Sequence, residues 1–451
     1  MDFVIIGGDA AGMSAASRAK RNRPDMSVTV LEKTMDVSYS ACGMPYNIAA
    51  PERSIEELVV RTADVFREKQ GINLLTGHEV IEIDRKHQTV SGTNQAGKEF
   101  RFPYDKLLIA TGATAVVPRL PGFDLPGVMV LKSLADGRRI KNYLIEKAVA
   151  KAVILGTGYI GLEMVEALRA RHMEVAMVEA LPQLAPWMEA SLVQVVGEEL
   201  EKNAIDLYTG REVTRIERLQ HRLLVVCKEL SLECDMVMTA VGVTPNSSLA
   251  RQTGLELGPK NSIAVDRKLQ TSDKHIYAAG DCADAFHVVS GQKTWIPLAL
   301  RANRSGWAVA DNVCGETAEL EGVAGTAVFK VFDLQVARTG LTVEEARAAG
   351  FAPEAVTINS RSRAHAHPGS SPIHVHMVGD KTSGRLLGVQ MVGREGVAHR
   401  INAPAVALHS RMTVAAFSQC DLAYAPPFGP TWDPLLVAAN QLMKKLGSSQ
   451  S

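Results

Sequence analysis

The chain has 451 residues, and its 49 lysines and arginines balance 49 aspartates and glutamates, so the formal net charge is zero. This length predicts two or three domains, and the balanced charge excludes the broad basic surface that binds nucleic acid or an anionic membrane. No apolar run approaches the roughly 20 residues of a membrane span, and MDFVIIGG has no signal-peptide pattern. Six scattered cysteines lack C-x-x-C spacing. We expect a cytoplasmic globular protein with reduced thiols, without a bound metal and without nucleic-acid or membrane partners.

The first elements along the chain are a strand, a glycine turn, a helix and a second strand within residues 2–33. Apolar DFVII leads into the turn GGDAAG at 7–12, and SVTVLEK follows the helix. This order is typical of a dinucleotide-binding βαβ unit, in which glycines let the backbone approach a pyrophosphate. Asp9 departs from the fingerprint because it stands where the second glycine is expected. Glu32, at the end of the next strand, is the predicted acceptor for ribose hydroxyls.

A lone cysteine, Cys42, follows in the stretch SYSACGMPY at 38–46. The next cysteine along the chain is Cys227, so no disulfide with a near neighbour in sequence is expected. A single cysteine is often a small buried apolar side chain, and it is a nucleophile only where its surroundings favour the thiolate. Whether Cys42 is a packing residue or a reactive one therefore depends on the sequence around it.

The same order of elements returns in residues 151–180, as KAVILG, TGYIGLEMVEALRARH and EVAMVEA. Here Gly156, Gly158 and Gly161 complete G-x-G-x-x-G between a strand and a helix. Glu179 ends the following strand, where a carboxylate binds ribose hydroxyls and repels a 2′-phosphate, so NADH is predicted over NADPH. Two such units predict an α/β protein with two parallel-sheet domains.

The remaining segments divide the chain further. Residues 113–244 are predicted as one domain inserted into another that residues 1–112 and 245–325 form, with the strand before the first crossing ending at Gly112. From Thr326 onwards, TAVFKVFD, HVHMVGD and RLLGVQMVG read as strands and alternate with helical stretches. We therefore expect a third, α+β domain over residues 326–451, with a frayed polar tail, KKLGSSQS.

Several motifs resemble the pyridine nucleotide-disulfide oxidoreductases, beginning with IATG at 109–112 and YAAGD at 277–281. Members with two cysteines carry C-x-x-x-x-C, but Asn47 stands at the second position here. The chain is similar instead to the single-cysteine branch of coenzyme A-disulfide reductases, NADH-dependent persulfide or polysulfide reductases, and NADH oxidases and peroxidases. The resemblance extends to DLAYAPPFGPTWDP at 421–434. It implies two Rossmann-like domains, for FAD and NAD, and a C-terminal α+β dimerisation domain.

The resemblance also implies a role for individual residues. Asp281 would hold the flavin ribityl chain, and Tyr424 would reach the flavin site of the other subunit of a homodimer. The predicted FAD-binding residues are Gly7, Gly12, Glu32, Thr111, Gly112, Asp281 and Ala299. The predicted NAD-binding residues are Gly156, Gly158, Gly161, Glu163 and Glu179. The predicted coenzyme A-binding residues are Ser14, Arg18, Arg21, Ser38 and Asn303.

Helical spacing places Ser14, Arg18 and Arg21 on one face of a helix. The alternative interpretation is that the two arginines are only solvated charges on the helix surface.

The sequence departs from the family pattern at three places, and the residues found there have no role that the resemblance defines. Leu300-Arg301 stands where many relatives have Gly-Pro, and HAHPG at 365–369 replaces a tyrosine pair. Trp432 stands in place of a lysine. His365 and His367 are candidate proton donors or only surface polar residues.

The expected chemistry passes electrons from NADH through the flavin to sulfur. The Cys42 thiolate would form a mixed disulfide with a small-molecule substrate, coenzyme A disulfide or coenzyme A persulfide or polysulfide. An NADH oxidase or peroxidase that cycles Cys42 through sulfenic acid is the alternative. A third hypothesis is a flavoprotein that donates electrons to a partner protein. The physiological acceptor stays open among disulfide, persulfide, polysulfide, quinone and oxygen.

Overall fold

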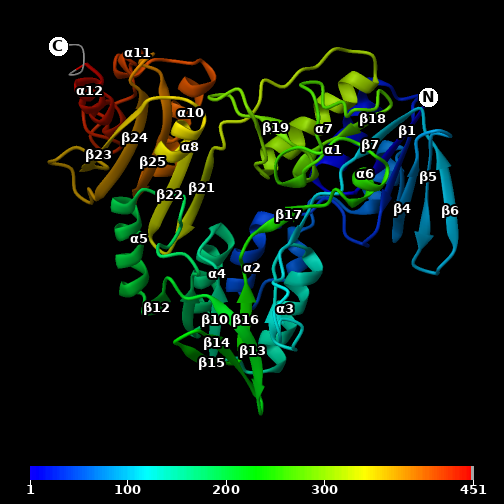
Figure 1. The fold of residues 1–451 in the computed structure, drawn as a ribbon, viewed down its shortest axis with the longest axis horizontal. Coiled ribbons are helices and arrows are strands. Elements are labelled where there is room, and N and C mark those ends of the chain that lie inside the picture. Colours follow the sequence, from blue (N-terminus) through cyan, green and yellow to red (C-terminus); the bar gives the residue numbers. More distant parts are fainter. Residues whose placement is uncertain (448–451) are drawn as a thin grey trace.

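The computed structural model describes residues 1–447 and contains three large sheets (Figure 1). The first is a parallel sheet in the order β18-β7-β1-β2-β3. Its strands are β1 (Asp2–Ile6), β2 (Ser27–Glu32), β3 (Asn73–Thr76), β7 (Lys106–Ile109) and β18 (Ile276–Ala278). Helices α1 (Ala10–Asn22) and α7 (Ala299–Val313) pack against each other beside it. A Cβ added to Gly306 would lie 2.2 Å from the Ala11 carbonyl oxygen, so the two helices cross in close contact.

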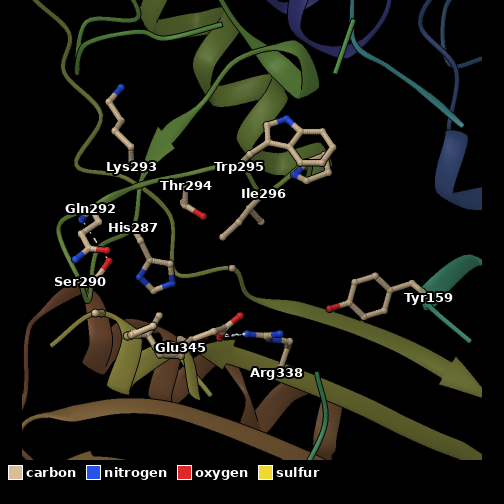
Figure 2. Close-up of a pocket in the computed structure, with 16 residues that line it drawn as sticks. Tyr159, His287, Ser290, Gln292, Lys293, Thr294, Trp295, Ile296, Arg338 and Glu345 are labelled. Carbon is tan, nitrogen blue, oxygen red and sulfur yellow. Dashed lines mark hydrogen bonds and ion pairs between the residues drawn. The ribbon is translucent and has the colours of Figure 1, made fainter. Parts of the chain in front are cut away.

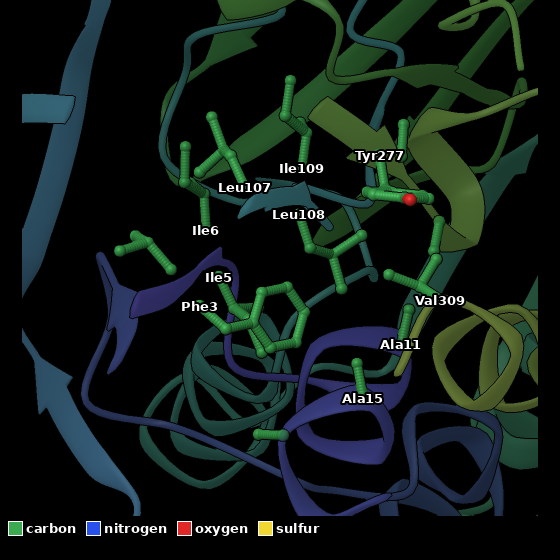
Figure 3. Packing of buried hydrophobic residues seen from close by; sticks show 14 of the residues in the cluster. Phe3, Ile5, Ile6, Ala11, Ala15, Leu107, Leu108, Ile109, Tyr277 and Val309 are labelled. Carbon is green, nitrogen blue, oxygen red and sulfur yellow. The ribbon is translucent and has the colours of Figure 1, made fainter. Parts of the chain in front are cut away.

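The core of this first unit is formed by strand residues that are apolar at successive positions. Phe3, Ile5, Leu107 and Leu108 are fully buried, and Figure 3 shows them packed toward helix residues such as Ala15. Strands covered on both faces are apolar at consecutive positions rather than alternately. This explains why DFVII and KLLI carry no polar alternation.

The second parallel sheet has the order β12-β11-β10-β16-β9. Its strands are β9 (Val128–Met129), β10 (Lys151–Leu155), β11 (Glu174–Val178), β12 (Ile205–Tyr208) and β16 (Met236–Thr239). The accompanying helices are α3 (Leu134–Glu146), α4 (Tyr159–Ala170) and α5 (Ala190–Lys202). The second predicted βαβ unit is therefore β10-α4-β11, as the first is β1-α1-β2.

The third sheet is antiparallel, in the order β21-β22-β25-β24-β23. Its strands are β21 (Ala327–Val331), β22 (Leu334–Gly340), β23 (Pro353–Arg361), β24 (Pro372–Asp380) and β25 (Leu386–Gly393). Its helices are α8 (Val343–Ala348), α9 (Val397–Arg400), α10 (Asn402–His409), α11 (Val414–Ser418) and α12 (Pro434–Gly447). The predicted frayed tail is helical as far as Gly447, and its last four residues lie outside the described part of the chain.

The two predicted crossings lie side by side. Strand β8 (Ala113–Ala115) pairs antiparallel with β17 (Val243–Pro245), so the chain leaves and re-enters the first unit along one ribbon. Strand β7 ends at Ile109 rather than at the predicted Gly112, because β1 and β18 pair with it only as far as Ile109. Gly112 follows in a left-handed conformation with φ of +69°.

Smaller elements complete the fold. Three-stranded sheets comprise β4 (His78–Asp84), β5 (Thr89–Asn94) and β6 (Glu99–Pro103), and β13 (Val213–Leu219), β14 (Arg222–Cys227) and β15 (Ser231–Cys234). The others are β19 (Ala285–Phe286), β20 (Lys293–Thr294), α2 (Met44–Ala49), α6 (Ser248–Gln252), η1 (Ala41–Gly43), η2 (Ile55–Leu58), η3 (Val65–Lys69), η4 (Pro259–Asn261) and η5 (Gly280–Cys282). Across residues 1–447, every helix is too short or too polar to cross a membrane.

Candidate active site

Three predicted flavin residues follow adjacent strands at one edge of the first sheet. Gly7 follows β1, Gly112 follows β7, and Asp281 follows β18, so all three lie where parallel strands end. This is the edge at which open α/β sheets bind nucleotides. Gly7 has φ of +113°, and a Cβ there would lie 2.2 Å from the Ala110 carbonyl oxygen. A Cβ on Gly12 would lie 1.9 Å from the Gly7 carbonyl oxygen, so glycine alone fits at both positions.

Glu32 is held beside this turn by hydrogen bonds. Its carboxylate accepts the Gly8 backbone N–H at 2.7 Å and the N–H and hydroxyl of Thr34 at 2.8 and 2.7 Å. A Cβ on Gly8 would lie 2.9 Å from the Glu32 Cβ, which leaves no room for a side chain there. The turn and the acid thus form one preorganised unit, as a ribose-binding carboxylate requires.

Asp9 occupies the irregular position of this turn and directly precedes α1. Burial raises the pKa of its carboxyl to about 6, and the nearby Glu32 charge acts in the same direction. The backbone N–H of Tyr39 and the Lys132 ammonium oppose that rise but do not cancel it. The departure from the fingerprint is therefore a half-buried acid at the start of α1.

Asp281 lies on the short η5 turn after β18. The Lys132 ammonium contacts its carboxylate at 3.1 Å, and the Trp295 indole N–H donates to its backbone carbonyl at 2.7 Å. Gly280, with φ of +79°, supplies the left-handed step before it. Lys132 from a distant segment and Trp295 from the same region of the chain therefore fix the position of Asp281.

Arg301 supports the same turn from inside the protein. Its buried guanidinium donates to the carbonyl oxygens of Gly280 and Ala283 at 3.0 Å and of Asp284 at 2.5 Å. A buried charge of this kind needs its hydrogen bonds satisfied, and three carbonyls satisfy it here. The role of Arg301, which the sequence left open, is thus structural, because its hydrogen bonds hold the backbone on both sides of Asp281.

The turn of the second unit repeats the geometry of the first. Gly156 has φ of +98°, and a Cβ there would lie 2.6 Å from the Ala240 carbonyl oxygen. A Cβ on Gly161 would lie 2.3 Å from the Gly156 carbonyl oxygen. A Cβ on Gly158 would meet no atom within 4 Å, so this glycine faces open space at the N-terminus of α4. That opening fits the pyrophosphate that the motif predicts.

Glu179 is the counterpart of Glu32 in the second unit. Its buried carboxylate accepts the Thr157 N–H at 3.0 Å and the Thr157 hydroxyl at 2.7 Å. The other carboxylate oxygen accepts the Leu181 N–H at 3.0 Å. The anion is therefore fixed at the end of β11, where it would repel an additional phosphate on the ribose.

Cys42 lies on the η1 turn that leads into α2, and its side chain is exposed. Helix α2 buries Met44 and Ile48 in the hydrophobic core that it shares with the second parallel sheet. The buried Lys141 ammonium of α3 donates to Asn47 and to the carbonyl oxygen of Ala50 at 3.0 Å. Cys42 therefore lies at the boundary between the two nucleotide-binding units.

The groups around Cys42 oppose ionisation of its thiol. Neighbouring atoms partly bury the thiol of this otherwise exposed residue and so raise the pKa of Cys42. The carboxylates of Glu163, Asp281 and Asp9 raise it further, while the Lys132 ammonium lowers it. A thiolate is the reactive form in disulfide exchange. These surroundings favour the thiol, whereas the expected chemistry needs the thiolate.

Four of the five predicted coenzyme A residues lie on two packed helices, α1 and α7. The Ser14 hydroxyl of α1 donates to the Asn303 side-chain oxygen of α7 at 2.6 Å. Arg18 pairs with Asp311 of α7 through two hydrogen bonds of 2.8 and 3.2 Å, and Arg21 is exposed. Asp311 was not recognised in the sequence, and it neutralises much of the charge that Arg18 would offer to a phosphate.

Ser38 lies beside the first turn, and Ala299 lies at the N-terminus of α7. The Ser38 N–H donates to the Gly8 carbonyl oxygen at 3.2 Å, and Ser38 has a φ of +49°, in the left-handed region. Ala299 is the exposed first residue of α7, and its carbonyl oxygen accepts the Asn303 amide at 3.0 Å. Thr111 lies near the crossing, where its hydroxyl donates to the Asn246 carbonyl at 2.6 Å.

A polar cavity of about 430 Å³ lies between the segment around β20 and the third sheet (Figure 2). Tyr159 of the second glycine turn, His287, and the ion pair between Arg338 and Glu345 line it. His287 Nδ1 accepts the Val289 N–H at 3.2 Å, and burial lowers the pKa of His287 to about 4. His287 is therefore neutral and has its proton on Nε2.

The C-terminal motif presents three exposed aromatic side chains, Tyr424, Phe428 and Trp432. Arg400 holds this segment through an ion pair with Asp433 at 2.7 Å and a hydrogen bond to the Phe428 carbonyl at 2.9 Å. The segment is fixed by the third domain while its aromatic rings stay uncovered.

The HAHPG stretch at 365–369 lies beside the C-terminal motif. The Ala364 N–H, just before the stretch, donates to the Pro426 carbonyl oxygen at 3.1 Å. His365 is exposed, and His367 Nδ1 approaches the Pro368 carbonyl oxygen at 3.0 Å. These contacts place both histidines in a surface loop of the third domain.

Two family models match the chain. Residues 1–306 match the pyridine nucleotide-disulphide oxidoreductases, and residues 326–434 match the dimerisation domain of the same proteins. The chain belongs to this family. The predicted family, enzyme class and fold class are therefore confirmed, with FAD and NAD domains and a C-terminal dimerisation domain.

Relatives of this oxidoreductase cover nearly its whole length. A coenzyme A-dependent NAD(P)H sulfur oxidoreductase of Pyrococcus abyssi is 39% identical over 97% of each chain. An NADH oxidase of Methanocaldococcus jannaschii is 33% identical over 99% of this chain and 100% of that protein. The solved structure of an NAD-dependent persulfide reductase from A. fulgidus superposes with a TM-score of 0.96 at 35% identity, covering 100% of this chain and 84% of that chain.

The structure of this oxidoreductase adds residues that the sequence did not reveal. Lys132 and Trp295 contact Asp281, and Tyr46 contacts Glu163. Two of these pairs, Lys132 with Asp281 and Tyr46 with Glu163, join segments more than 100 residues apart along the chain. Tyr46 lies inside SYSACGMPY, four residues after Cys42, so helical spacing could have indicated it. No local pattern marks Lys132 or Trp295.

Proposed function

We propose that this oxidoreductase passes electrons from NADH through FAD and Cys42 to coenzyme A disulfide or to coenzyme A persulfide or polysulfide. The observation that carries the proposal is the exposed Cys42, which has no second cysteine in its motif and lies at the boundary between the two nucleotide-binding units. Asn47 occupies the position of a second family cysteine, so the partner sulfur has to come from a substrate. The Pyrococcus abyssi and A. fulgidus relatives support a sulfur acceptor.

The first unit would hold FAD. Gly7 and Gly12 allow the close approach of the pyrophosphate, Glu32 would bind the adenosine ribose, and Asp281 would bind the ribityl chain. Thr111, Gly112 and Ala299 complete the proposed set at the same edge of the sheet. Bound FAD would supply two-electron transfer between nicotinamide and sulfur. Asp9 is the one member of the turn that departs from the expected fit.

The second unit would hold NADH. The open space at Gly158 admits the pyrophosphate between Gly156 and Gly161, and Glu179 accepts the ribose hydroxyls. Glu163, one turn into α4, completes the proposed set. Since Glu179 would repel a 2′-phosphate, kcat/KM for NADH should exceed that for NADPH in steady-state kinetics. A higher kcat/KM for NADPH would contradict this assignment.

Cys42 would act as the nucleophile. Its thiolate attacks one sulfur of coenzyme A disulfide, so a Cys42–coenzyme A disulfide forms and the other coenzyme A leaves as a thiolate. Ser14, Arg18, Arg21, Ser38 and Asn303 would hold the coenzyme A moiety along the surface of α1 and α7. With Arg18 paired to Asp311, the exposed Arg21 would carry much of the attraction for phosphate.

We also propose a homodimer in which Tyr424 approaches the site of the other subunit. The dimerisation domain and the exposed aromatic segment around Tyr424 support this assembly. The proposed domain division remains 1–112 with 245–325, 113–244, and 326–451. A cytoplasmic location is part of the same proposal, because coenzyme A disulfide chemistry through a free thiol suits a reducing compartment.

The Cys42→Ser variant tests the proposal directly. A serine hydroxyl stays protonated at neutral pH and cannot form a mixed disulfide, so turnover of coenzyme A disulfide should fall by at least about a hundredfold. NADH should still bleach the flavin in stopped flow, since the nucleotide turns are unchanged. Near-normal disulfide reduction by the serine variant would make Cys42 a packing residue and refute the proposal.

An NADH oxidase is the second candidate, favoured by the Methanocaldococcus jannaschii relative. Intact mass before and after treatment with a thiol reductant separates the two candidates. Loss of a mass equal to coenzyme A from Cys42 supports the first, because the mixed disulfide is its intermediate. Fast NADH-dependent oxygen consumption that needs Cys42, with no coenzyme A adduct, supports the second.

A further inference from the structure

A pair of polar side chains adjoins Cys42 on the side of the second nucleotide unit. The Tyr46 hydroxyl donates to Glu163 Oε1 at 2.9 Å and joins α2 to α4. The backbone stays helical through Gly43, with φ of −79° and ψ of −13°, so Cys42 and Tyr46 lie one turn apart on the same face. Cys42, Tyr46 and Glu163 therefore form one cluster.

We propose that Tyr46 and Glu163 are positioning residues that set how much of Cys42 is thiolate, Glu163 through its negative charge and Tyr46 by keeping Glu163 ionised. This inference rests on the proposed role of Cys42 as nucleophile. It gives Tyr46 a role and gives Glu163 a second one, besides the proposed contact with NADH.

The charges around the cluster fix the sign of the effect. Glu163 is, after burial, the largest contribution that raises the pKa of the Cys42 thiol. Asp281 and Asp9 act in the same direction, and Lys132 acts against them. Removing the Glu163 charge should therefore lower the pKa of Cys42 and increase the thiolate fraction at neutral pH.

Tyr46 affects the pKa of Cys42 indirectly, through the ionisation of Glu163. Burial raises the pKa of Glu163, the Tyr46 hydrogen bond lowers it, and the nearby Glu166 charge raises it. Without Tyr46, a half-buried carboxylate loses its donor and binds a proton at higher pH. A neutral Glu163 no longer opposes ionisation of Cys42, so loss of the Tyr46 hydroxyl has the same sign as loss of the Glu163 charge.

The arrangement has a chemical purpose. A resting thiol resists alkylation and oxidation, because the thiolate is the reactive form. The Tyr46–Glu163 pair keeps Cys42 mainly as a thiol until a substrate disulfide is in place. The pair also sets the pH at which turnover of that substrate begins to rise.

The protein is first treated with a thiol reductant and desalted, so that Cys42 is free of any mixed disulfide. The test then measures alkylation of Cys42 by iodoacetamide in the flavin-loaded protein without NADH, from pH 6 to 10, by mass spectrometry of the Cys42 peptide. The thiolate displaces iodide, so the rate follows the thiolate fraction. In Glu163→Gln, a thiolate fraction about tenfold higher, offset by lower intrinsic nucleophilicity, should give about threefold faster alkylation at pH 7.5. In Tyr46→Phe, alkylation should also be faster than in the wild type, but by a smaller factor, because only part of the Glu163 population loses its charge.

Two matched variants serve as controls. Tyr143→Phe removes a hydroxyl that donates to the Asp235 carbonyl oxygen, away from Cys42, and should alkylate at the wild-type rate. Glu166→Gln removes a neighbouring charge of α4 that pairs with Lys330 and should have a much smaller effect than Glu163→Gln. Flavin content and circular dichroism identify any variant that does not fold.

A wild-type alkylation profile in either Tyr46→Phe or Glu163→Gln overturns the proposal, and a slower rate in either variant overturns it as well. Because the assay needs no electron acceptor, it stays independent of the substrate assignment. If the wild-type protein does not reduce coenzyme A disulfide, the proposed function fails while this measurement still reports on Cys42.

Discussion

The two nucleotide turns share one geometry and differ at one position. Gly7 and Gly12 in the first unit match Gly156 and Gly161 in the second, and in both units a Cβ on the last glycine would strike the carbonyl of the first. At the middle position, the first turn carries Asp9 and the second Gly158. The comparison shows that close packing of helix against strand defines the turn, while the middle position is free to vary with what the turn binds.

The strongest test of this comparison is Gly12→Ala. A Cβ 1.9 Å from the Gly7 carbonyl oxygen forces the backbone apart, so the free energy of unfolding should fall by about 3 kcal/mol, the upper end for overpacking. Alanine in a helix is otherwise about 1 kcal/mol better than glycine, so the sign is informative. Urea unfolding measures the change. Unchanged or higher stability would show that helix packing does not define the turn.

Asp9→Asn probes the position at which the turns differ. The pKa of Asp9 rises from 3.8 to about 6 on folding, so the folded state holds the proton more tightly, and stability from this group is lost as pH rises through about 6. Asparagine removes that loss. Relative to wild type, the variant should gain roughly 2 kcal/mol between pH 4 and pH 7.5.

Thermal unfolding across that pH range measures the difference, and Asp124→Asn, at an exposed carboxylate, is the matched control. A constant difference between wild type and Asp9→Asn would mean that Asp9 titrates normally in the folded protein.

The smallest expected change is that of Gly158→Ala. A Cβ there meets no atom within 4 Å, so stability should stay within about 0.5 kcal/mol of wild type. The same methyl group intrudes on the space for a pyrophosphate, and KM for NADH should rise about tenfold while flavin content is unchanged. Steady-state kinetics and absorbance at the flavin band check both. An unaltered KM would place the dinucleotide elsewhere.

Most of the fold could be predicted from local sequence. Both βαβ units, their glycine turns and three strands of the third sheet, β21, β24 and β25, are encoded within short stretches, because apolar runs and turn glycines act over a few residues. Strands β22 and β23 were not predicted. The end of β7 was placed three residues too late, since it depends on where its neighbours β1 and β18 stop pairing. That information lies elsewhere in the chain.

The site was predicted less completely, for the same physical reason. Glu32 and Glu179 follow from their place after a strand, but Asp311 reaches Arg18 across 293 residues of sequence. Arg301 could be recognised as unusual, yet its role depends on three carbonyl oxygens of a turn that only the folded chain brings to it. Contacts between distant segments leave no periodic signal.

The placement of α2 limits how the protein can move. Met44 and Ile48 belong to the core of the second unit, and Lys141 ties α3 to the end of α2. Rotation of that unit about the β8–β17 ribbon would therefore have to move Cys42 with it or break this packing. Because the Ser38 N–H also donates to the Gly8 carbonyl oxygen of the first turn, the segment that carries Cys42 is held by both units and opposes their relative rotation.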